Sequence, residues 1–118
     1  MRTIIAGSRS IIRMSALTDA IRKSEGFITI TEVVSGGANG PDKLGEAWAL
    51  LNNIPIKRFP ADWESHGKQA GLIRNKQMAE YGEALIALWD GESKGTAHMI
   101  RIAGEKNIPT FIRVIRGF

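Results

Sequence analysis

The chain has 118 residues, with 16 lysines and arginines against 12 aspartates and glutamates, and a formal net charge of +4. This length suits one core, since domains most often have about 100 to 150 residues, and we expect residues 1–118 to form a single domain. Its 43% hydrophobic and 24% charged residues exclude a disordered or collagen-like chain. No apolar run approaches the roughly 20 residues that span a bilayer, so the sequence predicts a cytoplasmic protein with no membrane partner.

Composition also limits the chemistry. The chain contains no cysteine, which excludes disulfides, a thiolate nucleophile and a cysteine-based zinc site. His66 and His98 lie far apart in the sequence, so we expect no metal site, and we expect no cofactor. The positive charge favours an anionic partner, but it is scattered and lacks interleaved aromatic residues. A small anionic ligand therefore explains it as well as nucleic acid does.

Short apolar runs alternate along the chain with amphipathic segments of helical spacing. Runs rich in β-branched or aromatic residues predict strands at 3–6, 28–34, 54–59, 84–89 and 109–115. Apolar residues at helical spacing predict helices at 12–21, 44–51, 70–81 and 97–103. Together they predict an α/β fold, a Rossmann-like three-layer sandwich with a five-stranded, mostly parallel sheet.

In such sheets ligands bind outside the carboxyl ends of the strands, so the loops that follow the strands are candidate sites. The glycine-rich segment 35–42 follows a predicted strand and precedes a helix. Glycine lets backbone N–H groups approach an anion, although a tight turn with Asp42 at the helix start is the alternative explanation. We expect a phosphate-binding loop formed by Gly36, Gly37, Ala38, Asn39, Gly40 and Asp42.

A second loop, 90–96, repeats this pattern after a later strand. We expect Asp90, Ser93, Gly95 and Thr96 to contact the ligand there, and Ser93 or Thr96 to cap the following helix as well.

Cationic and polar residues near the same edge extend the predicted site. Gly7, Ser8 and Arg9 end the first strand, and Arg9 can bind a phosphate bidentately or stack on a base. Arg74 and Asn75, near the start of the third helix, add a second cation and an amide. No catalytic triad follows from the spacing, and Asp42 and Asp90 are the candidate catalytic carboxylates because they border the expected pocket.

The tryptophans differ in their surroundings. Trp48 falls on an apolar helix face and Trp89 ends an apolar strand, so we expect Trp48 in the core and Trp89 in the core or a pocket wall. Trp63 lies in a polar loop, where a large aromatic side chain suits stacking on a base or sealing a subunit interface.

An ordered set of short motifs resembles the SLOG superfamily, which includes the LOG phosphoribohydrolases and the Smf/DprA DNA-processing proteins, and above all its short YspA/YpsA-related branch. The resemblance covers nearly the whole chain. It rests on the motifs Ala6-Gly7-Ser8-Arg9, Gly36-Gly37-Ala38-x-Gly40-x-Asp42 with Ala47-Trp48, Ala70-Gly71-x-x-Arg74-Asn75-x-x-Met78, and Trp89-Asp90-Gly91-x-Ser93-x-Gly95-Thr96 before Met99-Ile100.

The resemblance implies a Rossmann-like domain that binds a nucleotide or a nucleotide-derived ligand. Together with Trp63, it also implies a homo-oligomer, a dimer or tetramer. In the LOG enzymes an arginine and a glutamate that follows a Gly-Thr loop carry the hydrolysis, and Arg74 and Gly95-Thr96 are similar to the arginine and the loop. Ala97, His98, Met99 and Ile100 follow Thr96, so the glutamate has no counterpart.

Three functions follow in order of preference. The first is a module that binds a nucleotide or nucleotide-derived phosphate ligand and senses or sequesters it. The second is a hydrolase that cleaves an N-glycosidic or phosphate bond of the same ligand, as a LOG-like phosphoribohydrolase does. The third, a nucleic-acid-binding protein, ranks last because the sequence contains no basic stripe.

Overall fold

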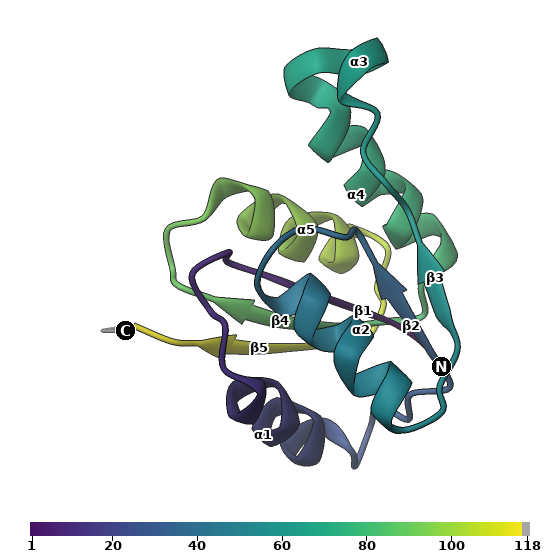
Figure 1. Ribbon diagram of the computed structural model, residues 1–118, viewed down its shortest axis with the longest axis vertical. Coiled ribbons are helices and arrows are strands. Elements are labelled where there is room, and N and C mark those ends of the chain that lie inside the picture. Colours follow the sequence, from purple (N-terminus) through teal and green to yellow (C-terminus); the bar gives the residue numbers. More distant parts are fainter. Residues whose placement is uncertain (117–118) are drawn as a thin grey trace.

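The computed structural model describes residues 1–116, in which strands and helices alternate (Figure 1). The elements are β1 (Arg2–Gly7), α1 (Met14–Ser24), β2 (Glu32–Ser35), α2 (Pro41–Leu51), β3 (Ile56–Arg58), α3 (Trp63–His66), the 3-10 turn η1 (Gly67–Gln69), α4 (Ala70–Tyr81), β4 (Ala84–Trp89), α5 (Lys94–Glu105) and β5 (Thr110–Val114). Among the described residues no helix is long and apolar enough to cross a membrane.

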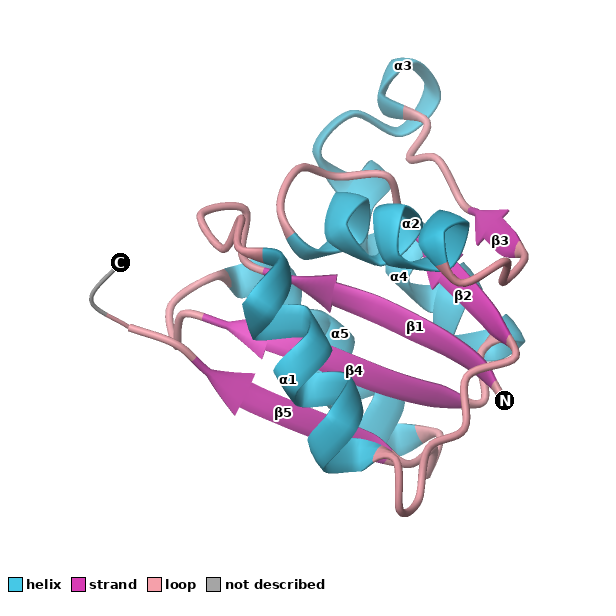
Figure 2. Cartoon of the chain, turned by 60° about the horizontal axis from the view of Figure 1, so that its bottom comes forward, coloured by secondary structure: helices cyan, strands magenta, loops and turns pink. Residues whose placement is uncertain are grey.

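The strands of residues 1–116 form one five-stranded sheet in the order β3-β2-β1-β4-β5. Every neighbouring pair in it is parallel, which confirms the predicted α/β fold (Figure 2). The chain builds β1, β2 and β3 toward one edge and then crosses to β4 and β5 on the other side of β1. The sheet therefore has its topological switch point between β1 and β4, where ligands bind in folds of this kind.

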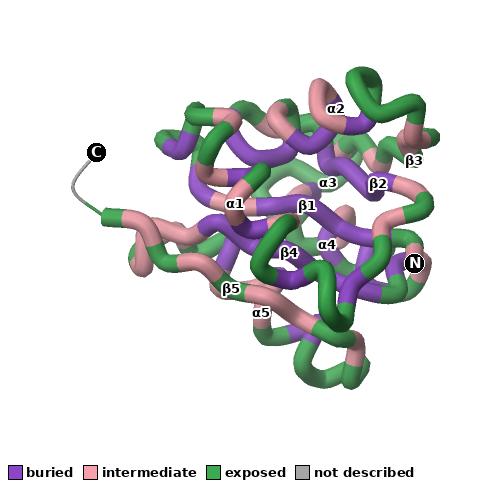
Figure 3. Tube along the Cα trace, turned by 90° about the horizontal axis from the view of Figure 1, so that it is seen from below, coloured by how far each residue is buried: buried purple, intermediate pink, exposed green. Residues whose placement is uncertain are grey.

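Helices pack on both faces of the sheet through two apolar clusters, which gives the fold its three layers. Ile4 and Leu85 pack under α4 and α5, whereas Ile5 and Ile86 pack under α1 and α2. Successive side chains of a strand point to opposite faces, so β1 and β4 are apolar at nearly every position. Figure 3 shows these two strands as the buried centre of the molecule.

The predicted strand at 28–34 is shorter in the structure. The chain turns after α1, with the N–H of Ile28 donating to the carbonyl of Ser24 at 2.9 Å, and β2 begins only at Glu32. Ile28 is nevertheless buried in the cluster under α1 and α2. The apolar character of this stretch thus reflects burial of a turn rather than strand pairing.

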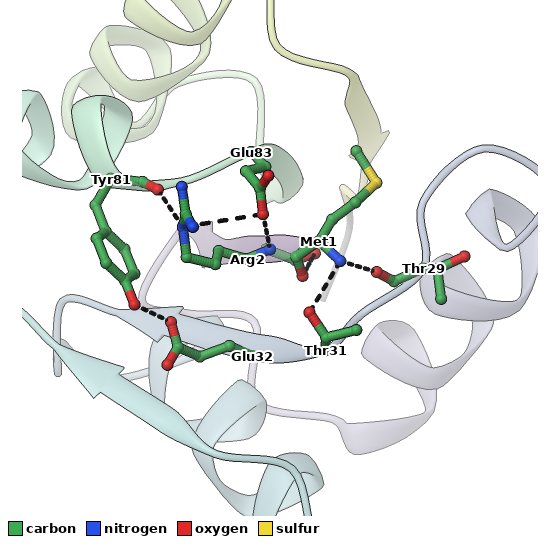
Figure 4. A network of polar contacts seen from close by, with 8 residues as sticks. Met1, Arg2, Thr29, Thr31, Glu32, Tyr81 and Glu83 are labelled. Carbon is green, nitrogen blue, oxygen red and sulfur yellow. Dashed lines mark hydrogen bonds and ion pairs between the residues drawn. The ribbon is translucent and has the colours of Figure 1, made fainter.

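Polar contacts tie the strands together at the amino edge of the sheet, opposite the loops of the predicted site (Figure 4). The backbone N–H of Arg2 donates to Glu83 at 2.9 Å, and its Nε donates to the carbonyl of Tyr81 at 2.7 Å. The Tyr81 hydroxyl donates to Glu32 at the start of β2. These contacts join β1 to β2 and to the end of α4.

Helix α3 and the turn η1 are elements that the sequence pattern did not predict. The Asp62 carboxylate accepts the N–H of Ser65 at 3.1 Å and caps α3. Four residues are too few to show helical periodicity. In Figure 1, α3 stands away from the sheet beyond the start of α4.

Candidate functional site

Two adjoining cavities open at the carboxyl ends of β1, β2 and β4. The outer cavity has a volume of about 410 Å³ and the inner cavity about 110 Å³. Arg9, Ala38 and Arg74 line both, so these residues form the wall between them. The structure thus brings together residues from the loops after three strands and from α4, as the sequence predicted for this edge.

Most of the predicted site residues line these cavities. Gly36, Gly37 and Trp63 line the outer one. The inner cavity is lined by Gly7, Asp42, Asn75, Ser93, Gly95 and Thr96. Ser8, Asn39, Gly40 and Asp90 are not among the lining residues of either cavity.

Arg74 projects from the first turns of α4 across the glycine-rich loop. Its Nη1 donates to the carbonyl of Gly36 at 2.7 Å, and its Nε donates to Asn75 Oδ1 at 3.1 Å. A side chain at position 36 would overlap the guanidinium, so glycine there makes room for Arg74. Burial lowers the pKa of Arg74, Asp42 opposes this shift, and the charge of Arg9 adds to it. Two cationic groups therefore lie near each other at the common wall.

Asp42 is a buried carboxylate at the start of α2, and it lines the inner cavity. Its Oδ2 accepts the N–H of Ala38 at 3.3 Å. Burial raises the pKa of Asp42 to about 6, while the N–H groups of Ala38 and Gly36 and the charge of Arg74 act in the opposite direction.

The glycine-rich loop uses its N–H groups internally in this structure. The N–H of Gly37 donates to Ser35 Oγ at 3.1 Å, and that of Ala38 donates to Asp42. The sequence predicts a phosphate at these donors. In this structure the loop holds the carboxylate of Asp42 instead. The loop therefore also acts as the tight strand-to-helix turn that was the alternative explanation.

Replacing Asp42 by asparagine is expected to change how stability depends on pH. Because folding raises the pKa of Asp42 from 3.8 to about 6, the wild type loses stability as the pH rises from about 4 through about 6. The loss is about 3 kcal/mol at most, at about 1.4 kcal/mol per pKa unit. Asp42→Asn removes the buried charge, so its free energy of unfolding should fall less than that of the wild type, measured by urea unfolding at pH 4 to 8.

Asp90, in a neighbouring loop, offers a control, because its pKa is shifted in the opposite direction. Hydrogen bonds from the N–H groups of Ser93 and Glu92 hold the pKa of Asp90 below its usual range. Asp90→Asn should therefore lose stability above pH 4 relative to the wild type. Parallel pH profiles for the wild type and Asp42→Asn would contradict a buried, charge-disfavouring site at position 42.

The N-terminus of α5 forms the far side of the inner cavity. Ser93 caps this helix, since its Oγ accepts the N–H of Thr96 at 3.4 Å and lies 3.1 Å from Thr96 Oγ1. First-turn N–H groups lack intrahelical acceptors and carry the positive end of the helix dipole. With Gly95 and Thr96 in the cavity wall, this end suits an anion such as phosphate.

Asn75 connects the two helices that border the inner cavity. Besides accepting from Arg74, it donates from Nδ2 to the carbonyl of Gly95 and to Nδ1 of His98, both at 3.2 Å. Its amide thus orients Arg74 toward Gly36 and fixes α4 against the start of α5.

Asp90 and Ser8 hold the neighbouring loop in place. Asp90 Oδ1 accepts the N–H groups of Glu92 and Ser93, both at 2.8 Å, and the N–H of Asp90 donates to Ser8 Oγ at 2.9 Å. Gly40 has a positive φ of 86° and approaches the backbone of Ser8 and Arg9 closely. The structure therefore gives Ser8, Gly40 and Asp90 contacts within the loops themselves.

The sequence reasoning missed three charged residues of the outer cavity, which are Lys43, Glu46 and Arg58. Two signals in the sequence could have found Glu46 and Arg58. Glu46 follows Asp42 by four residues, which places both on one face of α2. Arg58 ends β3, and the carboxyl ends of parallel strands share one edge.

Trp48 takes its expected place in the apolar packing, whereas Trp89 belongs to neither core cluster and lines neither cavity. Trp48 is half-buried against the cluster under α1 and α2, and Trp89, also half-buried, donates from Nε1 to the carbonyl of Ser93 at 3.1 Å. Trp63 is 54% exposed and borders the outer cavity from α3. Within residues 1–116, no three His, Cys, Asp or Glu side chains lie so as to hold a metal ion.

Together, the parallel sheet and the cleft at its switch point define a Rossmann-like α/β protein with a cationic two-part site. A sequence model of the YspA, cpYpsA-related SLOG family, YAcAr, matches residues 1–66. The chain is also 35% identical over 119 residues to the Gene 61 protein of Mycobacterium phage D29, with 92% of each chain covered. The chain therefore belongs to the YAcAr family of SLOG proteins, which confirms the resemblance. No solved structure matches it.

Membership in a SLOG family connects the chain with nucleotide-related, Rossmann-like proteins. The matched segment includes the glycine-rich loop and Asp42, whereas Arg74 and the start of α5 lie beyond it.

Proposed function

We propose that the protein binds a nucleotide or a nucleotide-derived phosphate ligand across the two cavities, in order to sense or sequester it. One observation carries this proposal, the position of Arg9 and Arg74 in the wall common to both cavities. A phosphate group there lies between two guanidinium groups and faces the N-terminus of α5.

The outer cavity has the size and the lining for the rest of such a ligand. Its volume of about 410 Å³ falls within the roughly 300 to 1,000 Å³ of typical small-molecule sites. Lys43 and Arg58 add positive charge to its wall, and Trp63 offers an aromatic face on which a base can stack.

Mass spectrometry of small molecules that copurify with the native protein is the first test. A panel of nucleoside mono- and diphosphates would follow, read as thermal shifts and as products. A ligand that binds only the folded state raises the melting temperature, by an amount that grows with its concentration. Absence of any shift across the panel, with no copurifying ligand, would overturn the proposal.

A second function, hydrolysis of a nucleotide, is favoured by one observation, the buried Asp42 carboxylate with a pKa of about 6 in the wall of the inner cavity. A carboxyl group with this pKa can exchange a proton near neutral pH, as general acids and bases do. Release of free base or phosphate from the panel, abolished in Asp42→Asn with binding retained, would establish the enzyme. Binding without turnover would establish the binding module.

We also propose that the chain forms a dimer or tetramer. Trp63 on α3 and Leu72 in the first turn of α4 are large apolar side chains, exposed by 54% and 44%. Apolar surface of this kind is typical of subunit contacts. Light scattering at micromolar concentration is the direct test, and a monomeric mass would overturn this part of the proposal.

A further inference from the structure

Glu46 is a carboxylate in the wall of the otherwise cationic outer cavity. Glu46 projects from α2, and only 7% of its surface is exposed. Its Oε2 accepts the hydroxyl of Ser35 at 2.6 Å, and its Oε1 accepts Nε of Arg58 at 3.2 Å. Both oxygens are thus oriented by partners on the ends of β2 and β3.

These two contacts leave Glu46 with acceptor capacity toward the cavity. A carboxylate offers about four acceptor positions, and Ser35 and Arg58 use two of them. Because both oxygens are held in place, the remaining lone pairs present a fixed pair of neighbouring acceptors. Such a pair matches two adjacent donors on a ligand better than one isolated donor.

The charge of Glu46 also decides what it can accept. A phosphate beside a carboxylate is disfavoured by repulsion between like charges, so phosphate groups are directed toward Arg9 and Arg74. The part of the ligand that faces Glu46 must then carry no negative charge and must donate hydrogen bonds. In a nucleotide, two groups have this chemistry, the vicinal diol of ribose and the N1–H and N2 amino edge of guanine.

We propose that Glu46 is the specificity-determining residue of the site and selects the nucleoside half of the ligand through a pair of adjacent, uncharged donors. This inference rests on the proposed function, because it assumes a phosphate-bearing ligand at the common wall. It adds that the outer cavity holds a ribose diol or a guanine edge at Glu46, with Trp63 available to stack on the base.

Calorimetric titration with two matched pairs of ligands tests this selection. AMP against 2′-deoxyAMP removes one hydroxyl of the diol, and GMP against IMP removes the amino group of the guanine edge. We expect the wild type to bind the intact member of at least one pair about tenfold more tightly, as for loss of a hydrogen bond to a charged group. The pair that discriminates identifies which donor group faces Glu46.

Glu46→Gln should then reduce that preference to less than about twofold, because the amide replaces one acceptor with a donor. Lys43→Gln is the matched control, since Lys43 lines the same cavity with the opposite charge. It should weaken both members of each pair alike and leave their ratio unchanged. If Glu46→Gln does not fold, Glu46→Asp is the second variant. It keeps the negative charge, but its shorter side chain moves the carboxylate away from the ligand, so it should reduce the preference in the same pair.

The possible failures are distinguishable. Equal binding within both pairs by the wild type would overturn the selection by Glu46 and leave the proposed function standing. A preference that persists unchanged in the Glu46 variants would also overturn it. If none of the four nucleotides binds, the selection by Glu46 is overturned, whereas the proposed function fails only when the wider panel and the copurification also yield no ligand.

Discussion

Gly7→Ala is expected to destabilise the protein by about 3 kcal/mol or more, because position 7 has no space for a Cβ atom and the added atom must distort its surroundings. A Cβ atom at Gly7 would overlap the carbonyl oxygen of Leu88 and lie 2.7 Å from Cγ of Pro41. That carbonyl accepts the N–H of Ser8 at 2.9 Å. Neither strand can move away without breaking the pairing of β1 with β4 at the centre of the sheet.

Urea unfolding monitored by circular dichroism measures this effect. Gly104→Ala is the matched control, since nothing lies within 4 Å of a Cβ at this position of α5. Alanine is favoured over glycine inside a helix, so this variant should gain up to about 1 kcal/mol. Equal unfolding midpoints for Gly7→Ala and the wild type would show that β1 and β4 do not approach as closely as the structure has them.

The sheet was predictable because burial leaves a plain pattern in the sequence. Both faces of β1 and β4 are covered by helices, so residues 3–6 and 84–89 are almost continuously apolar. Amphipathic segments between such runs require parallel pairing through crossovers. The same pattern overextended β2, since it cannot distinguish a buried turn such as that at Ile28 from a paired strand.

The gathering of the candidate site residues at one edge was also predictable, whereas their hydrogen bonds were not. Parallel topology gathers the loops after the strands and the starts of the following helices at one edge, and this brings Arg9, Asp42 and Arg74 together. Residue types alone do not say whether an N–H group is free. The Gly37 and Ala38 donors bind Ser35 and Asp42, a competition visible only once the side chains are in place.

Glu46 and Arg58 escaped prediction for a different reason. Charged residues on a helix or at the end of a short strand are usually solvated, so the spacing of Glu46 from Asp42 and the place of Arg58 at the end of β3 are weak signals. Their significance comes from the Ser35–Glu46–Arg58 contacts, which join residues up to 23 positions apart.

Arg74→Ala should reduce affinity for a phosphate-bearing ligand by about 10- to 100-fold, the range expected for losing charge-assisted hydrogen bonds. Arg74 supplies one of the two cations at the common wall, and its Nη1 also holds the carbonyl of Gly36. Arg74→Lys keeps the charge without the planar fork, so it should recover only part of the affinity. Calorimetric titration with the ligand recovered from the native protein measures both variants.

Arg101→Ala is the control, because Arg101 is an exposed arginine of α5 that lines neither cavity. It should bind within about twofold of the wild type, since an exposed charge outside both cavities is screened by salt. Loss of Arg74 should in addition raise the pKa of Asp42 further, because the Arg74 charge lowers it. Wild-type affinity in Arg74→Ala would move the phosphate away from the common wall, toward Lys43 and Arg58.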